Sequence, residues 1–169
     1  DQSVIENPKH LRKSEKRLAK LQRDLSRKEK GSCNRAKAKI KVAKLHEKIT
    51  NQRLDFLHKN SSKIISDNQA IVLEDLKIKN MVQNRKLAKS ISEVSWGMFR
   101  LMIEYKADWY GREVIIAPPN YASSQLCSGC GNQSSQTKDL SCRTYVCPVC
   151  GLEIDRDYNA SLNLVKLAV

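Results

Sequence analysis

The sequence lacks any long apolar segment. None of its hydrophobic runs approaches the ~20 residues needed to cross a bilayer, which argues against a transmembrane helix. The start, Asp1 to Asn7, is polar and shows no secretory signal, so we expect a reducing compartment. Internal repeats and low-complexity tracts are also missing. The 169 residues are enough for one ordinary domain or two small ones.

The sequence also has few acidic residues relative to its basic ones. The chain has 18 Asp and Glu against 31 Lys and Arg, which gives a formal net charge of +13. Such an excess of one sign repels itself in a compact protein unless a polyanion binds to it. Nucleic acid is the expected partner, and an anionic membrane surface is the second candidate.

Two long helices are predicted for residues 8–66, with a break at Gly31-Ser32 and with Ser32 or Asn34 as the cap of the second helix. Apolar residues recur at coiled-coil spacing in both segments, and this pattern predicts an antiparallel helical hairpin. The apolar seam consists of Leu11, Leu18, Leu21, Leu25, Ala38, Val42, Leu45, Ile49 and Phe56.

The predicted hairpin is strongly basic. Between Lys9 and Arg53 there are 17 Lys and Arg but only 4 Asp and Glu. A solvated helix face is the simpler explanation for most charge runs, but this imbalance favours contact with phosphates. The candidate nucleic-acid-binding residues are Lys9, Arg12, Lys16, Arg17, Lys20, Arg23, Arg27, Lys37, Lys41 and Lys44.

The remaining chain predicts an α/β core. The apolar run at residues 70–73 predicts a strand buried on both faces, and residues 114–117 predict a second such strand. Between the strands, residues 77–84 have the composition of a loop, and apolar residues at helical spacing predict one helix over about 85–109. A last short helix is expected at residues 157–167.

Four cysteines form two CxxC pairs. Cys127 and Cys130 are followed, after sixteen residues, by Cys147 and Cys150. In such knuckles, backbone N–H groups point at the thiolates, and four sulfurs close a tetrahedron around zinc at ~2.3 Å. Because protein ligands fill all four positions, we expect a structural rather than a catalytic ion in a zinc ribbon.

Other interpretations of the cysteines remain open. Two disulfides are disfavoured by the expected reducing compartment, and a redox CxxC motif is disfavoured by the ribbon spacing. Cys33 lies in the basic helical region and is most simply a spare thiol. Cys142 lies inside the ribbon, where a loop residue is the simpler interpretation and an alternative metal ligand is the other.

Three carboxylates lie where predicted elements end or begin. Glu74 follows the first predicted strand, and Asp155 and Asp157 lie at the start of the last helix. Functional groups gather at the carboxyl ends of strands in open α/β sheets, and carboxylates that meet there repel unless they bind a divalent cation. Each also has a structural explanation: a solvated strand end, a helix N-cap, and a favourable charge in the first helical turn, respectively.

Several segments together resemble the C-terminal half of the TnpB/OrfB proteins, the insertion-sequence transposases related to compact type V CRISPR nucleases. The most specific part of the resemblance is the cysteine ribbon combined with Asp155-Arg156-Asp157-Tyr158-Asn159-Ala160. The resemblance covers essentially the whole chain, and its other segments are Ile71 to Leu76, Asn84 to Ala88, and Pro119 to Gln125 leading into the first CxxC pair.

The resemblance implies a RuvC-like nuclease of RNase H-like fold, which a guide RNA directs to DNA and which cuts with Mg²⁺. It assigns the second catalytic residue of the family to Glu74 and the third to Asp157, with Asp155 as a weaker candidate. It implies DNA and guide RNA as partners, no membrane, structural Zn²⁺ and catalytic Mg²⁺ as cofactors, and a prokaryotic, cytoplasmic, nucleoid-associated location.

The resemblance also implies a partial RuvC/RNase H-like core with two insertions. Residues 1–68 are expected to form the basic hairpin, 69–120 the core strands and helix, 121–153 the zinc ribbon, and 154–169 the last core helix with the final catalytic Asp. The first catalytic Asp of the family belongs to a D-x-G strand upstream of these residues, and Asp1 does not have the context to replace it. We therefore expect a C-terminal fragment whose acidic cluster is completed by an N-terminal segment.

Three functions remain open from the sequence. The chain is a nuclease that is active only with the missing segment, a zinc-ribbon protein that binds nucleic acid and cuts nothing, or a decayed transposase remnant. A D-x-G strand upstream in the reading frame would favour the nuclease, and an initiation codon near residue 1 would favour the other two.

Overall fold

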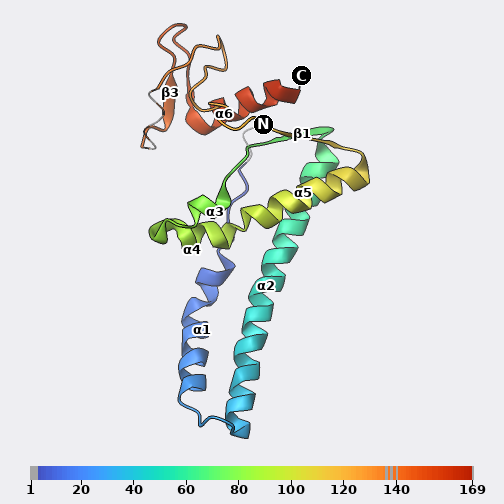
Figure 1. Ribbon diagram of the computed structural model, residues 1–169, viewed down its shortest axis with the longest axis vertical. Coiled ribbons are helices and arrows are strands. Elements are labelled where there is room, and N and C mark those ends of the chain that lie inside the picture. The colour runs from blue at the N-terminus through green and yellow to red at the C-terminus, as the bar shows by residue number, and fades with distance from the viewer. Residues whose placement is uncertain (1–3, 136, 138, 140, 169) are drawn as a thin grey trace. The chain divides into compact units, whose positions relative to one another are not determined.

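The computed structural model describes residues 4–135, 137, 139 and 141–168, and the chain divides into two compact units (Figure 1). The helical unit comprises Ile5–Ile64 and Lys77–Lys106. The core unit comprises Asp1–Val4, Ile65–Leu76 and Ala107–Val169. Asp1, which lacks the sequence context to replace the first catalytic Asp, lies outside the described residues.

The predicted hairpin is confirmed. Helix α1 (His10–Ser26) and helix α2 (Cys33–Asp67) run side by side, as Figure 1 shows. Their seam buries Leu18, Leu45 and Ile49, with partly buried Leu11, Leu21 and Val42 packed around them. The predicted cap is also present, since Ser32 Oγ accepts a hydrogen bond from the N–H of Arg35 at 3.2 Å.

The segment between the predicted strands is more broken than its periodicity indicated. A one-turn helix, α3 (Ile78–Met81), occupies the expected loop. The prediction of one continuous helix over about 85–109 was wrong. The segment forms two helices, α4 (Arg85–Val94) and α5 (Trp96–Tyr110). Ser95 lies between them with φ 57°, a left-handed conformation that ends a helix for any residue with a side chain. The apolar spacing continues across this break, so the pattern alone did not reveal it.

Strands β1 (Ala70–Leu73) and β2 (Glu113–Ile116) pair in parallel, with Ala70 opposite Glu113 and Leu73 opposite Ile116. The expectation that both strands are buried on both faces was wrong, since Ile71 alone among their residues is buried. Within the described residues this sheet has two strands, so each has a neighbour on one side only. The sheet brings the residue after β1, Glu74, to the same edge as the chain that leaves β2.

The cysteine region folds around a second small sheet. Strand β3 (Thr144–Val146) pairs antiparallel with β4 (Glu153–Asp155), and helix α6 (Arg156–Val165) follows directly, ending in the 3₁₀ turn η2 (Lys166–Ala168). Tyr145 is fully buried there, and its hydroxyl donates to the carbonyl of Asn132 at 3.2 Å. The chain is therefore α/β, as predicted. Among the described residues, no helix is both long and apolar enough to cross a membrane.

Candidate functional site

The four predicted ligands come together in a single cluster. The Sγ atoms of Cys127, Cys130, Cys147 and Cys150 all lie within 4.8 Å of one another. The Sγ atoms of Cys127 and Cys150 are 3.6 Å apart, and those of Cys130 and Cys147 are 3.5 Å apart. Four sulfurs at ~2.3 Å from a central ion would be separated by about 3.8 Å, so this cluster has the dimensions of a tetrahedral metal site. The cluster could therefore hold a metal ion.

Both knuckles have the tight backbone that such a cluster requires. After each pair, the N–H of Gly131 bonds to the carbonyl of Cys127 at 2.9 Å, and the N–H of Gly151 bonds to that of Cys147 at 3.0 Å. These glycines have φ of 76° and 71°, which a residue with a side chain adopts only at a cost. The turns place backbone N–H groups toward sulfur, as for Cys150 N–H and Cys147 Sγ at 3.5 Å.

The electrostatics of the cluster also favour a bound cation. Backbone N–H groups, that of Cys150 first, lower the pKa of the Cys147 thiol to about 6, so this sulfur is readily a thiolate. The Leu152 N–H also lowers the pKa of the Cys150 thiol. The neighbouring sulfurs outweigh it and raise that pKa to about 12, because they oppose a second negative charge in the cluster. A cation at the centre would remove that opposition.

The remaining cysteine interpretations are now distinguishable. All six cysteines are free thiols in the structure, so neither CxxC pair is a disulfide. Cys142 does not belong to the cluster, and its Sγ donates to the carbonyl of Thr144 at 3.1 Å, as expected for a loop residue. Cys33 is exposed at the first residue of α2.

Two of the three predicted carboxylates line one pocket of the core unit. Glu74, directly after β1, and Asp157, in the first turn of α6, both face an open pocket of about 390 Å³. We call it the carboxylate pocket. It is lined by Glu74, Ser123, Ser124, Thr137, Arg156, Asp157, Ala160, Ser161 and Leu164. Both carboxylates are exposed, so water and ions can reach them.

Each of these two carboxylates already has a polar partner. The hydroxyl of Ser123 donates to Glu74 Oε1 at 2.8 Å. Arg156 donates to Asp157 Oδ1 through Nε at 3.1 Å and Nη2 at 3.0 Å, and Arg143 lies 3.8 Å from Oδ2. Because the Asp157 side chain is 70% exposed, such ion pairs are worth about 0–1 kcal/mol. A divalent cation can therefore compete with the arginines for Asp157.

Asp155 has a structural role. It is the N-cap of α6, and its Oδ1 accepts from the N–H groups of Asp157 and Tyr158, each at 2.9 Å. Its carboxylate satisfies two of the N–H groups that a helix start leaves unpaired. Asp155 is not among the residues that line the carboxylate pocket.

The basic residues of the hairpin do not all face the same surroundings. Arg17, Lys41 and Lys44 line a groove between α1 and α2, together with Leu21, Leu45 and Lys48. We call these six residues the basic groove. Arg12, by contrast, is engaged within the protein: its Nη2 donates to Ser90 Oγ at 2.8 Å, and its Nε lies 3.5 Å from the buried carboxylate of Glu93. Some of the predicted cations therefore line a groove, whereas Arg12 is paired with Glu93 within the helical unit.

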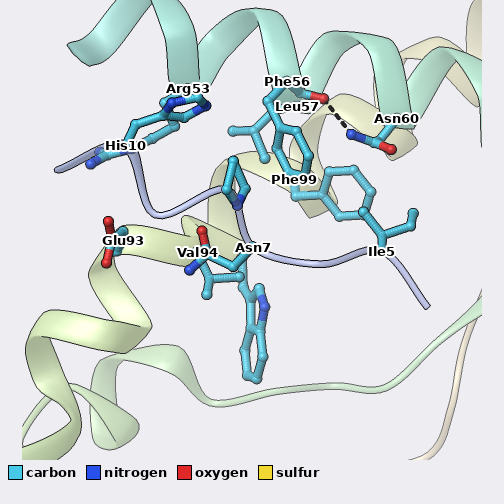
Figure 2. Close-up of a pocket in the computed structure, with 12 residues that line it drawn as sticks. Ile5, Asn7, His10, Arg53, Phe56, Leu57, Asn60, Glu93, Val94 and Phe99 are labelled. Atoms are coloured by element: carbon cyan, nitrogen blue, oxygen red, sulfur yellow. Dashed lines mark hydrogen bonds between the residues drawn. The ribbon is translucent and has the colours of Figure 1, made fainter. Parts of the chain in front are cut away.

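A further pocket lies in the helical unit and is mainly apolar (Figure 2). Its volume is about 130 Å³, and the side chains of Phe56, Leu57 and Phe99 contribute much of its wall. His10 and Arg53 lie at one end of the view. None of the predicted site residues lines this pocket, so it is separate from the predicted chemistry.

Sequence reasoning missed the buried amides behind the carboxylate pocket. Asn159 and Asn163 are 0% and 2% exposed on α6, although polar helix positions are usually solvated. They also hold the loop that contains Ser123, whose side chain the sequence did not single out. Their spacing was the available signal, since residues four apart lie on one helix face and two amides there can bind a single loop.

Comparison with protein families gives two matches that together span most of the chain. Residues 1–85 match the OrfB_IS605 model, described as "Probable transposase". Residues 96–164 match the model described as "Cas12f1-like, TNB domain". The second match contains the four-cysteine cluster and Asp157.

Individual relatives agree with these matches. A protein of Streptomyces pristinaespiralis named "Putative RNA-guided DNA endonuclease" is 48% identical over 95% of this chain, and InsQ of Escherichia coli K12, given the same description, is 36% identical over 98%. The chain spans 40% and 44% of their lengths. One solved structure, a Cas12f1-sgRNA-target DNA complex, has the same fold with a TM-score of 0.61 and 20% identity, covering 95% of this chain and 43% of that one.

Proposed function

Because the chain belongs to the TnpB/OrfB transposase family, we propose that it supplies two metal-binding carboxylates and a zinc ribbon to an RNA-guided DNA endonuclease. The observation that carries the proposal is that Glu74 and Asp157, far apart in sequence, line one open pocket. The relatives at 48% and 36% identity are described as RNA-guided DNA endonucleases, which supports the same reaction here.

Zinc is the proposed ion of the four-cysteine cluster. Tetrahedral sets of four thiolates select zinc or iron–sulfur clusters, and the knuckle-and-ribbon arrangement is typical of structural zinc. Since no coordination position is left for water or substrate, the ion would hold the ribbon together without taking part in hydrolysis.

Mg²⁺ is the proposed ion of the carboxylate pocket, within a RuvC-like core. The donor set fits, because Mg²⁺ is commonly held by one or two carboxylates, with water and substrate phosphates completing its octahedron. Glu74 and Asp157 would be its protein ligands in this chain. When bound, the metal activates water and stabilises the leaving oxygen of a phosphodiester.

The chain's own residues would prepare this pocket. Ser123 and Arg156 each hold one carboxylate, so the two acidic side chains are directed before any metal arrives. Arg156 and Arg143 also bring positive charge near the place where a DNA phosphate would lie, which favours binding of the polyanion.

DNA and a guide RNA are the proposed partners, with nucleoid association as a consequence. The basic groove supports this, because Arg17, Lys41 and Lys44 can neutralise successive phosphates along one strand. The family resemblance implies that the first catalytic Asp would come from outside residues 1–169.

The test is cleavage by a chain extended to the length of its relatives. Glu74→Gln and Asp157→Asn keep side-chain size but remove metal-binding charge, so each should lower Mg²⁺-dependent cleavage of guide-matched DNA by about 10³-fold or more. Binding of the same DNA, measured by filter retention in Ca²⁺, should be unchanged.

Glu153→Gln is the matched control, since Glu153 is an exposed carboxylate of β4 that does not line the pocket. Cleavage retained in Glu74→Gln or Asp157→Asn would remove that residue from the catalytic site. Tight nucleic-acid binding with no cleavage by the unmodified extended chain would favour the non-catalytic binding protein.

A further inference from the structure

Ser123 is a buried serine whose hydroxyl reaches an exposed carboxylate. It is 5% exposed, and its Oγ donates to Glu74 Oε1 at 2.8 Å across 49 residues of sequence. A hydrogen bond to a charged acceptor is among the stronger ones that a hydroxyl makes. An exposed Glu otherwise populates many rotamers, so this single bond selects among them.

The position of Ser123 is itself fixed by α6. Asn163 Nδ2 donates to the carbonyl of Ser123 at 2.9 Å and to that of Leu126 at 2.7 Å. Asn159 Nδ2 donates to the same Leu126 carbonyl at 2.6 Å, and its Oδ1 accepts from the Ser128 N–H at 2.9 Å. Buried amides with satisfied partners form a rigid network, so residues 123–128 are held as one piece.

The same helix carries the second carboxylate. Asp157 lies in the first turn of α6, two residues before Asn159 and six before Asn163. Helix α6 therefore presents Asp157 directly, and it holds Glu74 indirectly through Asn163 and Ser123. The positions of both carboxylates therefore depend on the same helix, although the two residues are far apart in the sequence.

We propose that Ser123 is a positioning residue, which holds the Glu74 carboxylate in the rotamer that shares a divalent cation with Asp157. This inference rests on the proposed function, because it concerns the same pocket. Groups that orient metal ligands through a hydrogen bond usually change metal affinity by about 10- to 100-fold when removed.

The experiment uses Mn²⁺ as the probe, with free Mn²⁺ measured by electron paramagnetic resonance. Ser123→Ala should weaken the Glu74-dependent Mn²⁺ binding of this chain by about 10-fold. Ser124→Ala is the matched control: Ser124 lines the same pocket, but its contact there is a carbonyl that accepts from Thr137. It should bind Mn²⁺ as the wild-type chain does.

A double-mutant cycle separates positioning from general loosening of the fold. In a Glu74→Gln background, Ser123→Ala should have no further effect on Mn²⁺ binding, because the ligand that it positions is gone. In the extended chain, Ser123→Ala should raise the Mg²⁺ concentration for half-maximal cleavage about 10-fold and change the rate at saturating Mg²⁺ much less.

The outcomes distinguish the two proposals. If Glu74→Gln and Asp157→Asn leave Mn²⁺ binding unchanged, the metal pocket of the proposed function is wrong and the role of Ser123 fails with it. If those variants lose Mn²⁺ but Ser123→Ala matches Ser124→Ala, or weakens binding equally in the Glu74→Gln background, only the positioning role is overturned.

Discussion

At the scale of single residues, Cys147 and Cys142 differ in burial and in the hydrogen bonds of their sulfur atoms. Cys147 is buried at 2% exposure, and backbone N–H groups stabilise its thiolate. Cys142 instead donates its S–H to a carbonyl outside the cluster. Three sulfurs without the fourth would leave an incomplete tetrahedron, and the small ribbon core of Cys127, Tyr145 and Cys147 would lose its centre.

Cys147→Ser should therefore release zinc. We expect about one equivalent of zinc in the wild-type chain and a small fraction of that in the variant, because structural zinc needs all four thiolates. The measurement is elemental analysis after dialysis against metal-free buffer. Cys142→Ser, tested beside it, should keep its zinc. Equal metal content in the Cys147 variant and the wild-type chain would reject the four-cysteine ligand set.

At the scale of elements, the hairpin combines a structural seam with a charged groove. The seam packs Leu18 against Leu45 and Ile49, and this packing determines which sides of α1 and α2 face each other. The same packing forms the basic groove, because it places Arg17 of α1 along the same groove as Lys41, Lys44 and Lys48 of α2. Lys59, further along α2, is instead paired with Asp55 at 2.7 Å.

Replacing Lys41, Lys44 and Lys48 together by Gln should weaken nucleic-acid binding and flatten its salt dependence. Each lost phosphate contact lowers the slope of log affinity against log salt by about 0.9 on duplex DNA. Fluorescence anisotropy across a salt series measures both quantities. Lys59→Gln, the control, should leave the slope unchanged. A slope that is flat in the wild-type chain would exclude the groove as a binding surface.

At the scale of the whole molecule, each of the two units contains a hydrophobic cluster of its own. The helical unit holds the hairpin seam, and the core unit holds the buried cluster of Cys127, Tyr145 and Cys147, with Leu152 and Ile154 beside it. The cysteine cluster has few buried apolar side chains around it, so the proposed zinc ion would supply much of the stability of this region. The hairpin buries a continuous apolar seam and contains none of the clustered cysteines.

Zinc removal should accordingly unfold one part of the molecule and spare another. After chelation, we expect amide hydrogens of residues 121–155 to exchange much faster, while those of α1 and α2 keep their protection. Hydrogen exchange with mass spectrometry measures both in one sample, and re-addition of zinc serves as the reversibility control. Equal loss of protection in the hairpin would contradict the independence of its core.

Two features of this protein could be predicted from the sequence alone. The CxxC spacing predicted the cysteine cluster, and the seam from Leu11 to Phe56 predicted the hairpin, because both features depend on residues close in sequence or on a regular repeat. The family resemblance also pointed to Glu74 and Asp157. Their placement in one pocket is a fact of the tertiary structure, since it depends on how β1 and α6 pack.

Other features only the tertiary structure decided. The helix break at Ser95, the half-buried strands and the buried amides of Asn159 and Asn163 leave no mark in apolar periodicity. The bond from Ser123 to Glu74 joins residues 49 apart, and no local propensity encodes such a contact. The physical reason is that periodicity reports which face of an element is apolar, whereas polar contacts between distant segments exist only after those segments have packed.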